Sequence, residues 1–314
     1  MKTTKLVVAG ILCAFTLLFA QVAPAADSYS GNWTLMPSEQ PGKVHFGLVY
    51  RRKHNQSQHS SDWPADAFEG LDLAVRGKRD VQFAVTRDAG RFDCEGYLSN
   101  GVGAGVFLFT PDAGYTRTMG SLGFTDIDEE KQFTMASVDV TAEFARQMKA
   151  EKLHGLDTGK LIALRIFDVT PQFIKEMRAE GMPMTDSNQV VAFRVHGVNV
   201  GMVREVRKLG IEVDGHKLIA MRVHGATPEW IAQMKKNGYD KLDVDQLIAF
   251  RVHGVTPEFV ASIEALGLKN VDPDQLVAMR IHGVTPEYIS KLKARGVKDL
   301  TIDQMVSLRV HGID

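Results

Sequence analysis

A motif of about 29 residues recurs along the chain from Val138 to the C-terminus, and it restricts the fold more than any other feature. One copy reads Val-Thr-Pro-Glu-Phe at 255–259 and Asp-Pro-Asp-Gln-Leu-Val-Ala-Met-Arg-Ile-His-Gly at 272–283. Five His-Gly pairs mark the copies, at intervals of 28, 29, 29 and 29 residues: His196, His224, His253, His282 and His311. A period this short holds one supersecondary unit, and such units must stack to bury a common core.

Each copy predicts two short helices. In the first, Thr256 is placed as the N-cap and Pro257 fits the first turn, where no N–H is needed. Apolar residues at 259, 260, 263 and 266 then define one helix face, which Gly267 ends.

The second helix of each copy is predicted by capping signals. Asp243, Asp272 and Thr301 are each followed three residues later by Gln, the spacing of a capping box. Gly254 and Gly283 are expected in the left-handed conformation that ends these helices. Six full copies therefore predict an α-solenoid of helical hairpins.

Two apolar columns recur with the period. We interpret both as core, with a binding stripe as the alternative for the aromatic one. The first contains Phe144, Phe173, Met202, Trp230, Phe259 and Tyr288, and the second contains Leu161, Val190, Leu218, Leu247, Leu276 and Met305. A seventh, degenerate copy is expected to begin at Thr110-Pro111 and to cap the array.

Residues 27–109 change to β-branched and aromatic runs with alternating character, at 44–50, 81–87, 92–98 and 106–109. They predict an antiparallel meander of four to six strands. The polar stretch 51–61 is expected to be a hairpin loop, either solvated or in contact with an anionic partner, and the glycine-rich stretch 100–105 a connection between strands.

The N-terminus has the pattern of a secretory signal peptide. Lys2 and Lys5 precede an apolar run at 6–20, followed by Ala-Pro-Ala at 23–25. The alternative, a membrane anchor, would need a longer apolar run. We therefore expect cleavage near residue 25, no membrane span in the mature chain, and a periplasmic or secreted bacterial protein. Cys94 would then be the remaining cysteine, either buried and inert or reactive.

The sequence contains none of the common catalytic signatures, such as His-Glu-x-x-His, Gly-x-Ser-x-Gly, Cys-x-x-Cys or a Walker sequence. We expect no enzymatic activity and no cofactor. The chain has 37 basic and 38 acidic residues, and without Lys2 and Lys5 the count is 35 against 38, a net charge of −3. Such a balance argues against nucleic acid as a partner.

Two polar columns accompany the second helices. Stacked helices lie about 8–10 Å apart, too far for neighbouring histidines to share a metal ion, so the histidines are expected to cap helix C-termini. The arginines two positions earlier either tie adjacent repeats together or bind an acidic peptide. Arg165 belongs to this column, and the candidate partner-binding residues are Arg194, Arg222, Arg251, Arg280 and Arg309.

The repeat Leu-Ile-Ala-Phe-Arg-Val-His-Gly-Val-Thr-Pro-Glu-Phe at 247–259 resembles the tandem repeats that follow the peptidase domain in some bacterial sensor metallopeptidases of the M56 (BlaR1-type) family. Arg-Asp-Ala-Gly-Arg-Phe-Asp-Cys-Glu-Gly at 87–96 and Gly-x-Gly-x-Phe-x-Phe at 103–109 resemble the β module that accompanies those repeats. The resemblance covers accessory parts only. The peptidase's transmembrane helices and zinc motif are absent from this sequence, so no proteolytic residue is implied.

The sequence thus predicts an α+β chain with a signal peptide at 1–25, a β domain at 27–109 and a helical repeat array at 110–314. The expected function is an exported, non-enzymatic scaffold whose solenoid binds another protein, in an envelope sensing or regulatory system. The alternative is a β domain that binds an envelope polysaccharide or small ligand, with the solenoid as spacer.

Overall fold

The computed structural model describes residues 29–52, 55–74, 76–297 and 299–313, and the side chains of 51–57 are left out of the description. The expected signal peptide lies outside the described residues. The chain divides into two compact units, one with the sheet and one with the helices, and the hairpin tip Val85–Arg91 groups with the helices. The predicted fold class is confirmed: an antiparallel sheet is followed by a helical repeat region.

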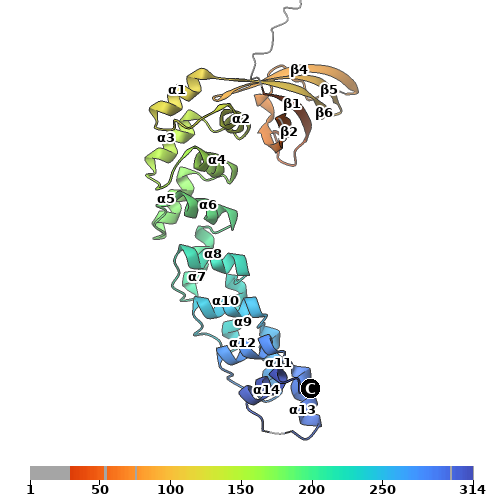
Figure 1. Cartoon of the computed structure of the whole chain (residues 1–314), viewed down its shortest axis with the longest axis vertical. Helices are drawn as coiled ribbons and strands as arrows, with labels where there is room; N and C mark the ends of the chain where they lie inside the picture. Colours follow the sequence, from red (N-terminus) through yellow and green to blue (C-terminus); the bar gives the residue numbers. More distant parts are fainter. Residues whose placement is uncertain (1–28, 53–54, 75, 298, 314) are drawn as a thin grey trace, which may run out of the picture. The chain divides into compact units, whose positions relative to one another are not determined.

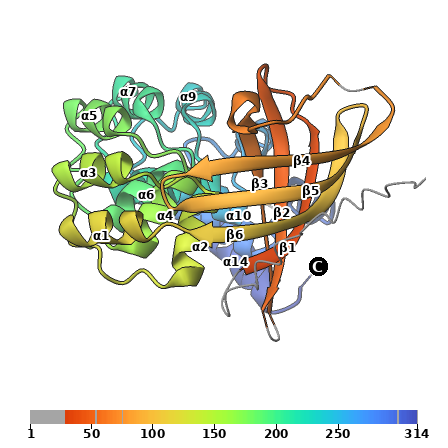
Figure 2. The ribbon, with the colours of Figure 1, turned by 90° about the horizontal axis from the view of Figure 1, so that it is seen from above.

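The sheet has six strands in the order β3-β2-β1-β6-β5-β4. Its members are β1 (Tyr29–Pro37), β2 (Lys43–Arg52), β3 (Asn55–Pro64), β4 (Lys78–Arg87), β5 (Gly90–Ser99) and β6 (Val102–Pro111). Two three-stranded meanders are joined through β1, which pairs antiparallel with both β2 and β6. In Figure 2, β4, β5 and β6 run side by side. The segment after β3 also pairs with β4, through Glu69 and Ala84.

Two expectations about the connections in this sheet were wrong. The polar stretch 51–61 is not a long loop, because β2 runs to Arg52 and β3 begins at Asn55. The glycine-rich stretch 100–105 is mostly strand, with a turn at 100–101 and β6 from Val102. In both cases pairing with a neighbouring strand determines the conformation, although the local sequence lacks the usual β-formers.

An aromatic core fills one face of the sheet. Trp33 at its centre is fully buried, and its indole N–H donates to the carbonyl of Glu95 at 3.0 Å. Phe46 stacks on Trp33 with ring centroids 6.3 Å apart, and Phe83 meets it edge-on at 5.0 Å. Aromatic pairs in these arrangements contribute beyond their buried area.

The helical unit consists of seven hairpins of short helices. The first helices are α1 (Ala113–Ser121), α3 (Ala142–Ala150), α5 (Pro171–Ala179), α7 (Val200–Lys208), α9 (Pro228–Lys236), α11 (Pro257–Ala265) and α13 (Pro286–Ala294). The second helices are α2 (Glu129–Ser137), α4 (Thr158–Ile166), α6 (Ser187–Val195), α8 (Gly215–His224), α10 (Val244–His253), α12 (Pro273–His282) and α14 (Ile302–Val310). Figure 1 shows α1, α3, α5 and α7 along one side of the array and α2, α4, α6 and α8 along the other.

The seventh copy exists, but its expected start was wrong. Thr110 and Pro111 belong to β6, and Asp112 is the N-cap of α1, where its carboxylate accepts from the backbone N–H of Tyr115 at 2.8 Å. Tyr115 lies 29 residues before Phe144 and is buried like it. It is therefore the first member of the aromatic column.

Capping side chains begin every hairpin helix, as the motif predicts. The capping boxes at Asp243 and Thr301 are confirmed. The one expected at Asp272 is absent from this described helix, because the carboxylate accepts from Asp274 instead and Gln275 donates to Asp303.

Both apolar columns are buried, with the aromatic column at 8% exposure or less, so their interpretation as core is confirmed. The glycines that end second helices are left-handed as expected, with φ of 71° at Gly254 and 72° at Gly283. No helix formed by the described residues is both long and apolar enough to cross a membrane.

Candidate binding surface on the helical array

Five members of the arginine column, from α4 to α12, tie their second helix to the end of the preceding one. Nε of Arg222 donates to the carbonyl of His196 at 3.0 Å, and Nε of Arg280 donates to that of His253 at 3.3 Å. Arg165, Arg194 and Arg251 make the same contact with the preceding repeat. A cation at these carbonyls satisfies the end of the helix and opposes its negative dipole.

Most of these arginines also lie over an aromatic ring of the preceding first helix. The guanidinium of Arg280 is 5.0 Å from the ring centroid of Phe259, and that of Arg251 is 5.2 Å from Trp230. The same stacking joins Arg165 to Phe144, Arg194 to Phe173 and Arg309 to Tyr288. The aromatic column therefore forms core on one side and a cation–π surface on the other.

The residue after each histidine position makes room for the arginine of the next repeat. A Cβ at Gly197 would lie 2.8 Å from Nη2 of Arg222, and one at Gly254 would lie 2.9 Å from Nη2 of Arg280. In the first two repeats an aspartate with positive φ takes this position, and Asp139 pairs with Arg165 at 2.8 Å. Either a small residue or a carboxylate thus accommodates the guanidinium.

A second column of cations ties the first helices together in the same way, and the sequence analysis missed it. Nζ of Lys235 donates to the carbonyl of Leu209 at 2.5 Å, and Nζ of Lys293 donates to that of Leu266 at 2.6 Å. Lys149, Arg178 and Arg207 do the same. The spacing of 28 or 29 residues was visible in the sequence, but the accepting carbonyls were not.

The histidine column matches its expected role only in part, because His224, His253 and His282 lie in the last turn of their helices but do not bond its carbonyls through their rings. The rings of His224, His253 and His282 are exposed and make no hydrogen bond to the part of the chain that the structure describes. His311 alone among the described members matches the expectation, with Nδ1 2.8 Å from the carbonyl of Ser307. The backbone carbonyls of His196, His224 and His253, and not their rings, take part in the junction, because each accepts a hydrogen bond from the arginine of the next repeat.

The residue between each arginine and histidine is exposed in all six full copies. Ile281, which lies between Arg280 and His282, is 54% exposed. We call these residues the apolar stripe, and their exposures are 52% for Ile166, 48% for Val195, 55% for Val223, 52% for Val252, 54% for Ile281 and 59% for Val310. Single exposed aliphatic residues are ordinary, but a regular row of them marks an interaction surface.

Neighbouring side chains widen the stripe on each second helix. In α10, Ile248 and Ala249 are half-buried and lie four and three residues before Val252, on the same helix face. Helices stack about 8–10 Å apart, so the six stripe residues span roughly 40–50 Å. In the first repeat the equivalent residue, Ser137, is 2% exposed, so the stripe begins at α4.

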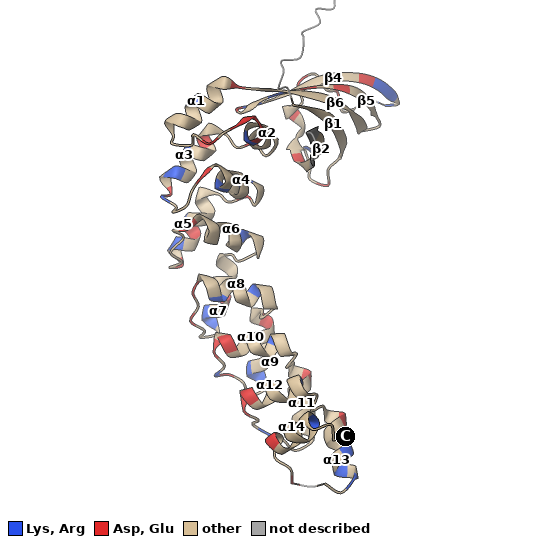
Figure 3. Cartoon of the chain, in the orientation of Figure 1, with Lys and Arg blue, Asp and Glu red and all other residues tan. Residues whose placement is uncertain are grey.

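Charge is mixed over the array and does not form a single-sign surface. Figure 3 shows Lys and Arg interspersed with Asp and Glu along the helices. Beside the stripe the pattern is more ordered, because an arginine precedes and, in five copies, a histidine follows each stripe residue. Arg194 keeps 32% of its side chain exposed.

Burial shifts the pKa of several groups in the described part of the chain, Cys94 and Tyr239 among them. Burial raises the pKa of the Cys94 thiol to about 12, as expected for an inert cysteine. Burial likewise raises the pKa of Tyr239 to about 12, and its hydroxyl donates to the carbonyl of Val271. Within the described ranges, no group of three or more His, Cys, Asp or Glu side chains could hold a metal ion.

No family model, curated protein or solved structure matches this chain.

Proposed function

We propose that the chain is a non-enzymatic scaffold that binds another protein along the apolar stripe. The observation that supports this is the exposure of one β-branched residue per repeat, at 48–59%, in six consecutive repeats. A position that served only stability would carry polar residues in at least some copies. Leaving apolar surface in water costs roughly 25 cal/mol per Å².

The proposed partner is a protein segment in the polyproline II conformation, with an apolar side chain at every third residue, because this conformation brings every third side chain to the same face. Three such residues span about 9 Å, which matches the roughly 8–10 Å between stacked helices. The arginines and histidines beside the stripe favour carboxylates on the partner. Arg194, Arg222, Arg251, Arg280 and Arg309 thus border the surface, and the first four also donate through Nε to a carbonyl of the preceding repeat.

We further propose that the protein works outside the cytoplasm as an accessory of an envelope sensing system. Support comes from the signal-like pattern around the apolar run at 6–20 and from the resemblance of 247–259 to repeats of sensor metallopeptidases. N-terminal sequencing of protein from the periplasm or medium tests the export. Cleavage near residue 25 is expected, and an intact N-terminus in the cytoplasm would contradict it.

The binding proposal is tested by site-specific photocrosslinking in the source cells. A photoreactive residue at Val223 or Val252 is expected to give a protein adduct of defined mass. Lys236, exposed at the end of α9 in the first-helix layer, is the matched control position and is expected to give none.

A second variant separates surface chemistry from folding. Val195→Ser and Ile281→Ser, added to the protein that carries the photoreactive residue at Val252, should weaken the adduct at least tenfold while the circular dichroism spectrum stays unchanged. Equal adduct yields at Val252 and Lys236, or an adduct yield that the serine substitutions leave unchanged, would contradict a docking role for the stripe.

A further inference from the structure

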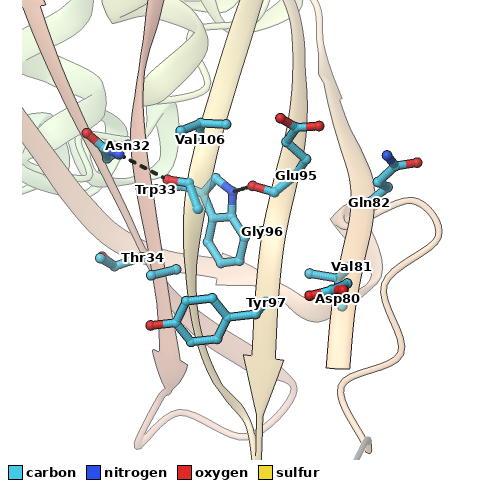
Figure 4. A pocket seen from close by; sticks show the side chains of 12 residues that line it. Asn32, Trp33, Thr34, Asp80, Val81, Gln82, Glu95, Gly96, Tyr97 and Val106 are labelled. Atoms are coloured by element: carbon cyan, nitrogen blue, oxygen red, sulfur yellow. Dashed lines mark hydrogen bonds between the residues drawn. The ribbon is translucent and has the colours of Figure 1, made fainter. Parts of the chain in front are cut away.

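The sheet contains a cleft on the face opposite its aromatic core. Four adjacent strands, β1, β6, β5 and β4, line it, and its volume is about 830 Å³. Figure 4 shows side chains from all four strands around it, including Thr34, Gln82, Glu95 and Tyr97. The volume lies within the range of roughly 300–1,000 Å³ that is usual for ligand sites.

The floor of the cleft consists of small residues that the packing below requires. A Cβ at Gly96 would lie 2.3 Å from the carbonyl oxygen of Ala104 and 2.8 Å from the Trp33 ring. A Cβ at Gly105 would lie 1.9 Å from the carbonyl oxygen of Glu95. Backbone therefore forms the floor, with the buried indole directly beneath it.

Polar side chains without internal partners surround this floor. Thr34, Asp80, Gln82 and Glu95 are exposed, and their side chains make no hydrogen bond to any described residue. Together they offer carboxylates, an amide and a hydroxyl, which can accept from and donate to several ligand groups at once. Free groups from three strands converge on one hollow.

Two apolar side chains complete the lining. Tyr97 is 44% exposed and Val106 is 46% exposed, although both sit among polar neighbours. Nζ of Lys78 lies 4.6 Å from the centroid of the Tyr97 ring and holds it in place. An aromatic ring with a polar end suits a ligand that has both C–H faces and hydroxyl groups.

We propose that this cleft binds a neutral saccharide, independently of the apolar stripe. A ring hydroxyl both donates and accepts, so it can pair with the carboxylates, the amide and the threonine hydroxyl, while its C–H face packs on Tyr97 and Val106. A phosphorylated or sulfated ligand is disfavoured, because the residues that line the cleft include two carboxylates, whereas Lys78 contacts the Tyr97 ring and is not among the lining residues. A purely apolar ligand would leave the polar rim unpaired.

Saturation-transfer NMR on the whole protein tests this, with cellotetraose, chitotetraose and maltotetraose as probes at millimolar concentration. At least one is expected to receive saturation through its ring protons. Glucose 6-phosphate is the charged comparison and is expected to receive less.

Variants locate the binding. Tyr97→Ala and the double change Gln82→Ala with Glu95→Ala should each weaken binding at least tenfold. Met36→Ala is the matched control, since Met36 is exposed on β1 but does not line the cleft. Near-ultraviolet circular dichroism, which reports the tryptophan core, confirms folding. Binding of none of the three oligosaccharides, or binding that Tyr97→Ala leaves unchanged, would overturn the proposal.

Discussion

At the scale of single residues, Arg280 shows how the repeat motif joins neighbouring hairpins. Its guanidinium donates to the carbonyl of His253, lies over the ring of Phe259 and fills the space that Gly254 leaves open. These contacts lie 21 to 27 residues before the arginine, in the preceding repeat. The Arg-x-His-Gly ending thus forms a junction between neighbouring repeats.

Replacing Arg280 with Ala should destabilise the array by about 1–3 kcal/mol, because a charge-assisted hydrogen bond and a cation–π contact are lost. Arg280→Lys keeps the charge but loses the planar fork, so it should recover part of this loss. Urea denaturation followed by circular dichroism measures both. Unchanged midpoints would assign the arginine to partner binding instead.

Two glycine substitutions can separate the steric effect of a Cβ at the junction from the cost of backbone strain. Gly254 and Gly210 have nearly the same φ, 71° and 73°, but a Cβ meets Arg280 at 2.9 Å only at Gly254, and at Gly210 it meets nothing within 4 Å. Gly254→Ala should therefore cost about 0.5–1.5 kcal/mol more than Gly210→Ala, the value of a disturbed hydrogen bond. The excess should vanish in an Arg280→Ala background. Equal costs in the parent would show that the arginine adapts freely.

Cys94 should resist modification in the folded protein. Its folded pKa of about 12 exceeds the value of about 8.5 expected in the unfolded chain, so the folded state favours the neutral thiol. The associated stability is present below pH about 8.5 and is lost as the pH rises toward 12. In a Cys13→Ser protein, a disulfide reagent at pH 8 should label no thiol natively and one in urea. Rapid native labelling would contradict this.

At the scale of helices, the cation column of the first helices has one defect. Glu264 occupies the position that Lys235 and Lys293 take in the neighbouring repeats. The equivalent acceptor is the carbonyl of Asn237, at the C-cap of α9. A carboxylate beside a helix C-terminus is unfavourable.

Glu264→Lys should therefore stabilise the protein by about 0.5–1 kcal/mol, by adding a cation at the end of α9. It should also lower the pKa of Tyr239, which Glu264 now helps to raise. Thermal melting at low and high salt measures the gain, which salt should reduce. Lys293→Glu is the reciprocal control and should destabilise by a similar amount. A lower melting temperature for Glu264→Lys would contradict a stabilising role for the cation column of the first helices.

At the scale of the whole molecule, the helical unit includes the tip of the β4–β5 hairpin. The side-chain amide of Gln132 donates to the carbonyl of Ala89 at 2.7 Å, and Asp88 accepts from the backbone N–H of Ala142 at 3.0 Å. Arg87 pairs with Asp139 at 3.3 Å. The first repeats thus rely on a segment that precedes them in the sequence.

A fragment of residues 111–314 should still fold into helices, because most contacts between repeats remain. Its first repeat and α3 should fray, since Ala89, which accepts from Gln132, and Asp88, which accepts from Ala142, are gone. Circular dichroism and hydrogen exchange test this: protection in α8–α14 should match the full chain and protection in α1–α3 should fall. A coil spectrum would mean that the hairpin tip is required for folding.

The helical array was predictable because its signals are local. Thr256, Pro257 and Gly267 define helix ends through contacts within a few residues. The strand at Asn55–Pro64 was not predictable in this way, because its polar sequence becomes a strand only by pairing with β2. The apolar stripe was missed for the opposite reason: a β-branched residue such as Ile281 reads as core unless the positions of neighbouring helices are known. The cleft likewise depends on which strands become neighbours.

Because each junction joins a residue to partners about one period earlier, whole units could be added or removed without altering any junction chemistry. The number of repeats would then set the number of equivalent binding positions along the array. A partner with a repetitive sequence would bind by multivalency, since each further repeat that it contacts acts at a high effective concentration. Changes in copy number would adjust the strength of binding and leave its specificity untouched.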